Sequence, residues 1–190
     1  MTIRICKPAP DVPVGVYVRG DPDAKRLTLA DYRGRWVVLA FYPRDFTPVC
    51  RTELQRLAEL EPAFEDEQAA VLAASTDSVH SHRAWIEGDP HLAGVRYPVL
   101  ADTSHKLARA FGVLTAGGAA LHATFILDPT GVVRHLLVND AGVGRSVEET
   151  LRTLQALRTG QPCPAGWHPG QCTLSGAWAA APVDRVAVNA

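Results

Sequence analysis

The feature that most constrains the fold is a continuous apolar run, RWVVLAFY, at residues 35–42, which stops at Pro43. A short run of branched and aromatic residues that ends at a proline is typical of a β-strand buried on both faces. Such a strand lies in the middle of a sheet. Residues 69–75, AAVLAAS, form a second apolar run and predict another strand.

Helical patterns alternate with these strands. Between residues 50 and 64, leucine and phenylalanine recur at steps of three and four residues, which predicts a helix with one apolar face. Further helices are predicted at 78–87, 104–111 and 146–160. The turn signal DPTG separates two strand-like runs at 122–127 and 132–138, which predict a hairpin. The order of elements indicates an α/β fold with a central mixed sheet flanked by helices on both faces.

Charge and length exclude several classes of protein. The chain has 190 residues, with 19 lysines and arginines against 20 acidic residues, a net charge of −1. This balance argues against partners that are nucleic acid or anionic membrane, because both are bound mainly by excess positive charge. The longest apolar run is far shorter than the about 20 residues that span a bilayer. We therefore predict a protein with no membrane span.

The two ends of the chain differ from its middle. The N-terminus has no apolar core behind Arg4 and Lys7, so we expect no secretory signal and a cytoplasmic location. Residues 161–190 are rich in proline, glycine and alanine and show no periodicity. We predict one domain at 1–160 and a C-terminal arm at 161–190.

One of the four cysteines stands out by its position. Cys50 falls at the start of the predicted helix 50–64, where unpaired N–H groups and the helix dipole favour a thiolate. Cys50 is therefore a candidate nucleophile. Thr47 can place its hydroxyl beside the sulfur or a substrate oxygen, and Pro43 can shield the site from water without offering an N–H.

The segment FYPRDFTPVCRTEL resembles the active-site loop of the peroxiredoxins, with Pro43, Thr47 and Cys50 matching its proline, threonine and peroxidatic cysteine. The resemblance is closest to the typical two-cysteine, alkyl hydroperoxide reductase (thiol-specific antioxidant) branch. Further matching stretches lie at 76–85, 97–102, 124–135, 138–156 and 163–170. The resemblance implies a thioredoxin-like fold with a C-terminal extension.

The resemblance also implies an activity, the reduction of hydrogen peroxide and organic hydroperoxides without a cofactor or metal. Cys50 becomes a sulfenic acid, which Cys163 of the partner subunit, in the motif CPAGWHPG, resolves as a disulfide. An external thiol reductase, such as thioredoxin or an alkyl hydroperoxide reductase flavoprotein, then restores the thiols. The implied assembly is a homodimer or a ring of dimers.

One position departs from the family pattern, which normally has an arginine where this chain has His122. A neutral imidazole would donate one hydrogen bond without charge, which predicts a slower peroxidase or an unusual substrate. Arg145 matches a second family arginine near the site, and Glu53 matches a glutamate that orients an arginine, although a solvent-facing carboxylate is an equal alternative for Glu53. Because His122 departs from the family pattern, two alternative functions stay open. The chain could be a chaperone-like member of the family, or a member recruited to another reaction.

The remaining cysteines have no assigned partner. Cys6 is most simply a small buried hydrophobic residue, and Cys172 is either an alternative resolving thiol or without a role. Cys163, His168 and Cys172 could instead be three ligands of a zinc ion, although no fourth ligand is near in sequence.

Overall fold

The computed structural model describes residues 5–21 and 25–174. Its centre is the pair of strands predicted from the two apolar runs, β3 (Trp36–Phe41) and β4 (Ala69–Ser75), which are parallel. Every residue of β4, and every residue of β3 after Trp36, is buried. This burial explains why both strands are apolar throughout and do not alternate.

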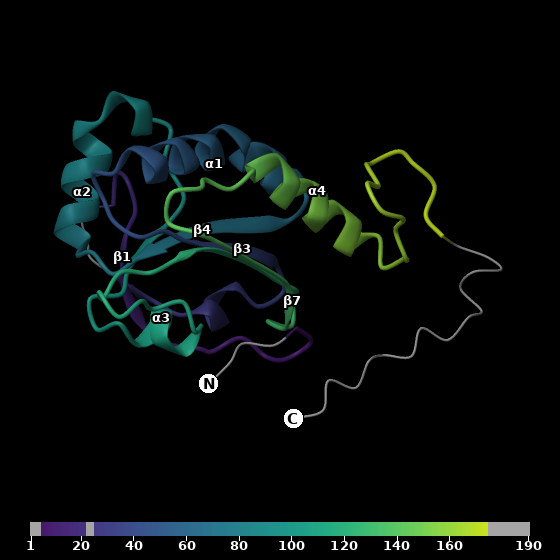
Figure 1. Ribbon diagram of the computed structural model, residues 1–190, viewed down its shortest axis with the longest axis horizontal. Coiled ribbons are helices and arrows are strands. Elements are labelled where there is room, and N and C mark those ends of the chain that lie inside the picture. Colours follow the sequence, from purple (N-terminus) through teal and green to yellow (C-terminus); the bar gives the residue numbers. More distant parts are fainter. Residues whose placement is uncertain (1–4, 22–24, 175–190) are drawn as a thin grey trace.

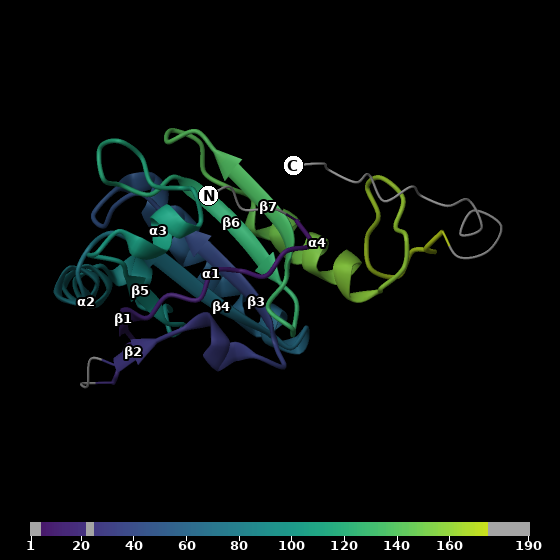
Figure 2. The ribbon, with the colours of Figure 1, turned by 90° about the horizontal axis from the view of Figure 1, so that it is seen from below.

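The sheet has seven strands in the order β2-β1-β5-β4-β3-β6-β7 (Figure 2). On one side of the centre, β5 (Val99–Ala101) is parallel to β4, and β1 (Val14–Tyr17) and β2 (Lys25–Leu27) follow as antiparallel neighbours. The sequence pattern predicted none of these three strands, because strands of three or four residues are too short to show a period. The positions of β1 and β5 in the sheet depend on pairing with strands that are distant in the sequence, and β2 pairs with β1.

The predicted hairpin forms the other edge of the sheet. β6 (His122–Leu127) is antiparallel to both β3 and β7 (Val133–Asn139). The Gly131 N–H closes the connecting turn onto the Asp128 carbonyl at 2.7 Å. Gly131 has a φ of +76°, and the Arg33 guanidinium fills the space that a side chain there would need. Glycine is therefore required at this turn.

Helices cover both faces of the sheet, as predicted (Figure 1). One face packs against α1 (Pro48–Asp66), α2 (Val79–Gly88) and α4 (Val147–Arg158) through Leu54, Leu57, Trp85, Ile86 and Leu154. The opposite face packs against α3 (Lys106–Ala110) and the short 3-10 helix η1 (Leu29–Tyr32). A second 3-10 helix, η2 (Pro90–Leu92), follows α2. The sheet thus has two apolar cores, one on each side.

The start of α1 carries the predicted nucleophile, Cys50. Thr47 is the N-cap residue, and Pro48 occupies the first helical turn, where its missing N–H costs no hydrogen bond. Cys50 therefore lies in the first turn, as the sequence predicted. The N-cap residue of α4 is Ser146, whose hydroxyl accepts a hydrogen bond from the Glu149 N–H.

Beyond α4 the chain extends away from the sheet as an irregular segment (Figure 1). Trp167 is buried there, and its carbonyl accepts a hydrogen bond from Arg152 of α4. The predicted arm, 161–190, is described as far as residue 174, and the rest lies outside the described residues. Within 5–21 and 25–174, no helix is long and apolar enough to cross a bilayer.

Candidate active site

Cys50 is delivered by the loop that joins β3 to α1. Its side chain is only 2% exposed, packed in the core between the sheet and α1. Thr47 donates its hydroxyl hydrogen to the Arg44 carbonyl at 2.9 Å, which leaves the hydroxyl oxygen as an acceptor. Pro43 is half-buried at the start of the same loop. The three residues of the predicted motif are therefore carried by one short segment of chain.

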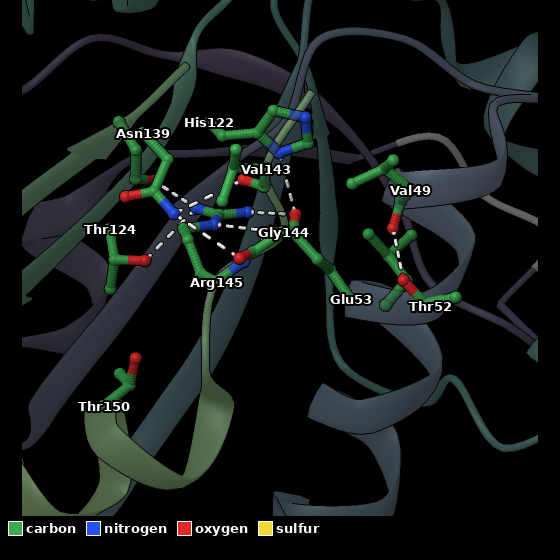
Figure 3. A network of polar contacts seen from close by, with 12 residues as sticks. Val49, Thr52, Glu53, His122, Thr124, Asn139, Val143, Gly144, Arg145 and Thr150 are labelled. Carbon is green, nitrogen blue, oxygen red and sulfur yellow. Dashed lines mark hydrogen bonds and ion pairs between the residues drawn. The ribbon is translucent and has the colours of Figure 1, made fainter. Parts of the chain in front are cut away.

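Glu53, one turn after Cys50, is the centre of a buried polar cluster (Figure 3). One carboxylate oxygen accepts hydrogen bonds from His122 Nδ1 at 2.9 Å and Arg145 Nη2 at 2.5 Å. The other accepts from Arg145 Nε at 2.9 Å and from the Arg145 backbone N–H at 2.7 Å. Glu53 is 3% exposed, so the solvent-facing alternative is wrong.

The charge state of Glu53 follows from these contacts. Burial alone raises the pKa of this carboxyl, but the hydrogen bonds from His122 and Arg145 outweigh it and lower the pKa from 4.5 to about 2. Glu53 is therefore a carboxylate at neutral pH.

Arg145 is held rigidly in the same cluster. Besides Glu53, its guanidinium donates to the Ala123 carbonyl at 2.7 Å and to the Thr124 hydroxyl at 3.1 Å (Figure 3). The sequence predicted that Arg145 lies near the site. In the structure its guanidinium contacts Glu53, one helical turn after Cys50. Thr124 is a member of the cluster that the sequence analysis missed.

His122 is the third titratable member of this cluster. It is the first residue of β6, is 1% exposed, and its Nδ1 is hydrogen-bonded to Glu53 at 2.9 Å. Burial lowers the pKa of His122, but the influence of Cys50 and Glu53 raises it overall, from 6.5 to about 9. The expectation of a neutral imidazole is therefore wrong. His122 carries a positive charge at neutral pH. The arginine that the family normally has at this position would supply the same charge.

A second buried polar cluster fixes the loop between β3 and α1, called the catalytic loop below. The sequence did not predict this cluster. Asp45, between Pro43 and Thr47, pairs with His82 Nδ1 of α2 at 2.9 Å and accepts hydrogen bonds from Tyr42 and Ser81. His82 is 0% exposed. The helical spacing from His82 to Trp85 and Ile86, both buried, was the signal that could have placed it in the core.

Removing Asp45 tests the importance of this pair. We expect Asp45→Ala to lower the free energy of unfolding by about 3 kcal/mol, because Tyr42 and His82, which are buried, and Ser81 lose their shared hydrogen-bond partner. Urea unfolding measures this change. Glu59→Ala, which breaks an exposed pair with Arg56, is the matched control and should leave stability unchanged. Equal effects of the two substitutions would contradict a structural role for Asp45.

The other three cysteines lie apart from this site. Cys6 is exposed, so the expectation that it is buried is wrong. Cys172 is also exposed, and Cys163 is partly buried with its sulfur 3.5 Å from the Thr159 hydroxyl. All four cysteines are free thiols. Among residues 5–21 and 25–174, no three His, Cys, Asp or Glu side chains lie together as metal ligands would, so Cys163, His168 and Cys172 do not form the alternative zinc site.

An open groove of about 400 Å³ lies beside the catalytic loop. Thr47 and Pro48 line it from the helix start, Trp85 from α2, and Phe46 from the loop. Phe46 is 64% exposed, with its ring centroid 5.8 Å from that of Trp85.

A model of the AhpC/TSA family matches residues 5–136 of the chain. This chain belongs to that family, the peroxiredoxins. Peroxiredoxin tpx1 of Schizosaccharomyces pombe is 44% identical over 182 residues, 92% of this chain and 94% of the relative. Peroxiredoxin prdx-2 of Caenorhabditis elegans is 45% identical over 178 residues, 90% of this chain and 88% of the relative.

Solved structures agree with this assignment. Reduced 2-Cys peroxiredoxin of Plasmodium vivax has a TM-score of 0.83 and 33% identity, covering 89% of this chain and 91% of that one. AhpC of Enterococcus faecalis has a TM-score of 0.80 and 34% identity, covering 86% of this chain and 100% of that one. The predicted family, thioredoxin-like fold and thiol-dependent peroxidase activity are thereby confirmed. Nothing in the comparisons favours the chaperone-like alternative.

Proposed function

We propose that Cys50 is the thiol that attacks the peroxide and that Cys163 of the partner subunit resolves the product. The observation that carries the first part is the position of the buried Cys50 in the first turn of α1, where the cationic His122 also acts on it electrostatically. The positive imidazolium and the N-terminal end of α1 both stabilise a thiolate, which is the reactive form of cysteine.

The proposed reaction begins when the Cys50 thiolate attacks the terminal oxygen of a hydroperoxide. The S–O bond forms, the O–O bond breaks, and water or an alcohol leaves, so that Cys50 becomes a sulfenic acid. The Thr47 hydroxyl oxygen can accept a hydrogen bond from the peroxide O–H, and Pro43 shields the sulfur from water. Glu53, itself held by Arg145, orients the His122 imidazole through Nδ1.

The separation of the two cysteines supports resolution by a second chain. Cys50 lies in the first turn of α1, whereas Glu67 at the other end of that helix pairs with Arg158 at the end of α4. The Cys163 sulfur lies beside Ala156 and Thr159, also at that end. At about 1.5 Å per residue, the 17 residues from Cys50 to Glu67 span about 25 Å. A disulfide needs Cα atoms within about 7 Å.

The family implies a peroxide substrate, a dimeric or larger assembly and a thioredoxin-type reductant. We propose for this chain a homodimer, alone or in a ring of dimers, reduced by thioredoxin or a flavoprotein reductase. Residues 161–190 form the arm that carries Cys163 to the partner, beyond a domain at 1–160. The cytoplasm is the proposed location, because the cycle begins from free thiols and needs a reducing compartment.

A subunit-mixing experiment tests the proposed disulfide. Peroxide should convert the parent into a covalent dimer on a non-reducing gel, whereas Cys50→Ser and Cys163→Ser alone should give none. When the two variants exchange subunits before treatment, the covalent dimer should return, because one chain supplies Cys50 and the other Cys163.

A tag on one variant verifies by pull-down that mixed oligomers have formed. Resolution by the partner is wrong if the verified mixed oligomers show no covalent dimer on the non-reducing gel. It is also wrong if peptide mass mapping of the peroxide-treated parent finds only an intrachain disulfide. Cys172→Ser is the matched control and should form the covalent dimer as the parent does.

A further inference from the structure

Cys50 cannot meet a second cysteine in the position that it occupies in this structure. It is 2% exposed and packed in the core between the sheet and α1. A disulfide joins two sulfur atoms about 2 Å apart, and a packed core has no room for the side chain and backbone of a second cysteine. The catalytic loop and the first turn of α1 must therefore open before the proposed disulfide forms.

Asp45 holds the catalytic loop closed. Its carboxylate accepts hydrogen bonds from the Tyr42 hydroxyl at 2.8 Å and the Ser81 hydroxyl at 2.6 Å, and it pairs with His82 Nδ1 at 2.9 Å. Its backbone N–H donates to the Asp77 carboxylate, just after β4, at 2.9 Å. The Asp45 side chain is 1% exposed. These bonds tie the loop to the ends of β3 and β4 and to α2.

The next residue, Phe46, has a strained backbone. Its φ is +57°, in the left-handed region, where the Cβ of an L-residue lies close to the following carbonyl oxygen. Phe46 is 64% exposed, so burial of its ring offsets little of that strain. Such strain persists only where neighbouring contacts hold the chain in place. Asp45 supplies those contacts on one side, and the Thr47 hydroxyl, which donates to the Arg44 carbonyl, supplies one on the other.

We propose that Asp45 and Phe46 act against each other to set how readily the catalytic loop opens for the resolving cysteine, an inference that rests on the proposed function. The Asp45 hydrogen bonds keep the loop closed, so that Cys50 stays in the first turn of α1 while it attacks the peroxide. Release of the Phe46 backbone strain lowers the free-energy cost of opening once Cys50 is a sulfenic acid.

Opening of the loop brings the Cys50 sulfenic acid to the partner's Cys163. The S–S bond forms, the S–O bond breaks, and the hydroxyl group leaves with the thiol proton of Cys163 as water. No further oxidant is needed, because the peroxide has already oxidised the Cys50 sulfur. Substitutions that shift the opening should therefore change the rate of disulfide formation and leave the rate of peroxide attack, which takes place in the closed loop, unchanged.

Phe46→Ala and Phe46→Gly isolate the backbone strain. Both remove the ring, and only alanine keeps the Cβ that is strained at a φ of +57°. Glycine favours the closed loop, so we expect disulfide formation to be about fivefold slower in Phe46→Gly than in Phe46→Ala. The second-order rate constant of peroxide attack should be the same in both. Rapid quenching with a thiol-blocking reagent measures the loss of the Cys50 thiol for the first step and the covalent dimer on a non-reducing gel for the second.

Gln68 provides a matched control pair. Its φ is +54°, and it lies just beyond the end of α1 that is far from the catalytic loop. Gln68→Ala and Gln68→Gly should therefore form the disulfide at equal rates. Equal rates for Phe46→Ala and Phe46→Gly, or faster formation in Phe46→Gly, would overturn the role of the strain. A Gln68 pair that differs as the Phe46 pair does would overturn it too, because the effect would then not be local to the loop.

Ser81→Ala tests the opposing role of Asp45. The substitution removes one hydrogen bond to Asp45 without changing a residue of the catalytic loop. We expect disulfide formation to be about fivefold faster than in the parent, at an unchanged rate of peroxide attack. Unchanged or slower disulfide formation would contradict the role of Asp45. Failure of the proposed function looks different, since the parent would then form no covalent dimer through Cys163.

Discussion

Cys50→Ser is expected to reduce the second-order rate constant for peroxide consumption by about 10⁴-fold or more, the scale seen when a catalytic nucleophile is removed. The serine hydroxyl is not ionised beside His122 and cannot attack the O–O bond as a thiolate does. Stopped-flow fluorescence gives the measurement, since Trp85 contacts Phe46 of the catalytic loop and reports changes there.

Two of the three other cysteines, Cys172 and Cys163, provide matched controls for this loss. Cys172→Ser should retain the rate of the parent. Cys163→Ser should consume one equivalent of peroxide at the parental rate and then stop, because its Cys50 sulfenic acid has no resolving thiol. If Cys50→Ser consumed peroxide at the rate of the parent, Cys50 could not be the attacking thiol.

Glu53→Gln is expected to cause the largest loss of stability of any single substitution in the site. The change removes the negative charge that Arg145 and His122 share, and both are buried. Breaking a buried ion pair costs about 3–5 kcal/mol. Urea unfolding at pH 7 measures the difference, with Glu148→Gln as control, because Glu148 pairs with Arg56 at the surface.

The pH dependence of this difference provides a stricter test. The pKa of Glu53 is lowered from 4.5 to about 2 in the folded state, so its stabilisation is fully present above pH 4.5 and is lost as the pH falls towards 2. At 1.36 kcal/mol per pKa unit, that stabilisation is about 3 kcal/mol. The stabilities of parent and Glu53→Gln should therefore converge in acid. A difference that stays constant from pH 7 to pH 2 would assign the effect to packing rather than charge.

The parts of the protein that were predictable are those whose signal is local in the chain. β3, β4 and α1 each carry a complete hydrophobic pattern within a few residues, so their types and approximate limits followed from sequence. The motif of Pro43, Thr47 and Cys50 is equally local, because one loop and one helix turn present all three residues.

The sequence by itself thus determined the family, the central strands and the candidate thiol. Tertiary structure alone decided the positions of β1, β2 and β5, the burial of Asp45 with His82, and the charge of His122. These features depend on groups distant in sequence: His122 and Glu53 are 69 residues apart, and Arg145 and Glu53 are 92 apart. A side chain's protonation state depends on the charges and desolvation around it. That environment exists only when the chain has folded, and here it makes His122 a cation.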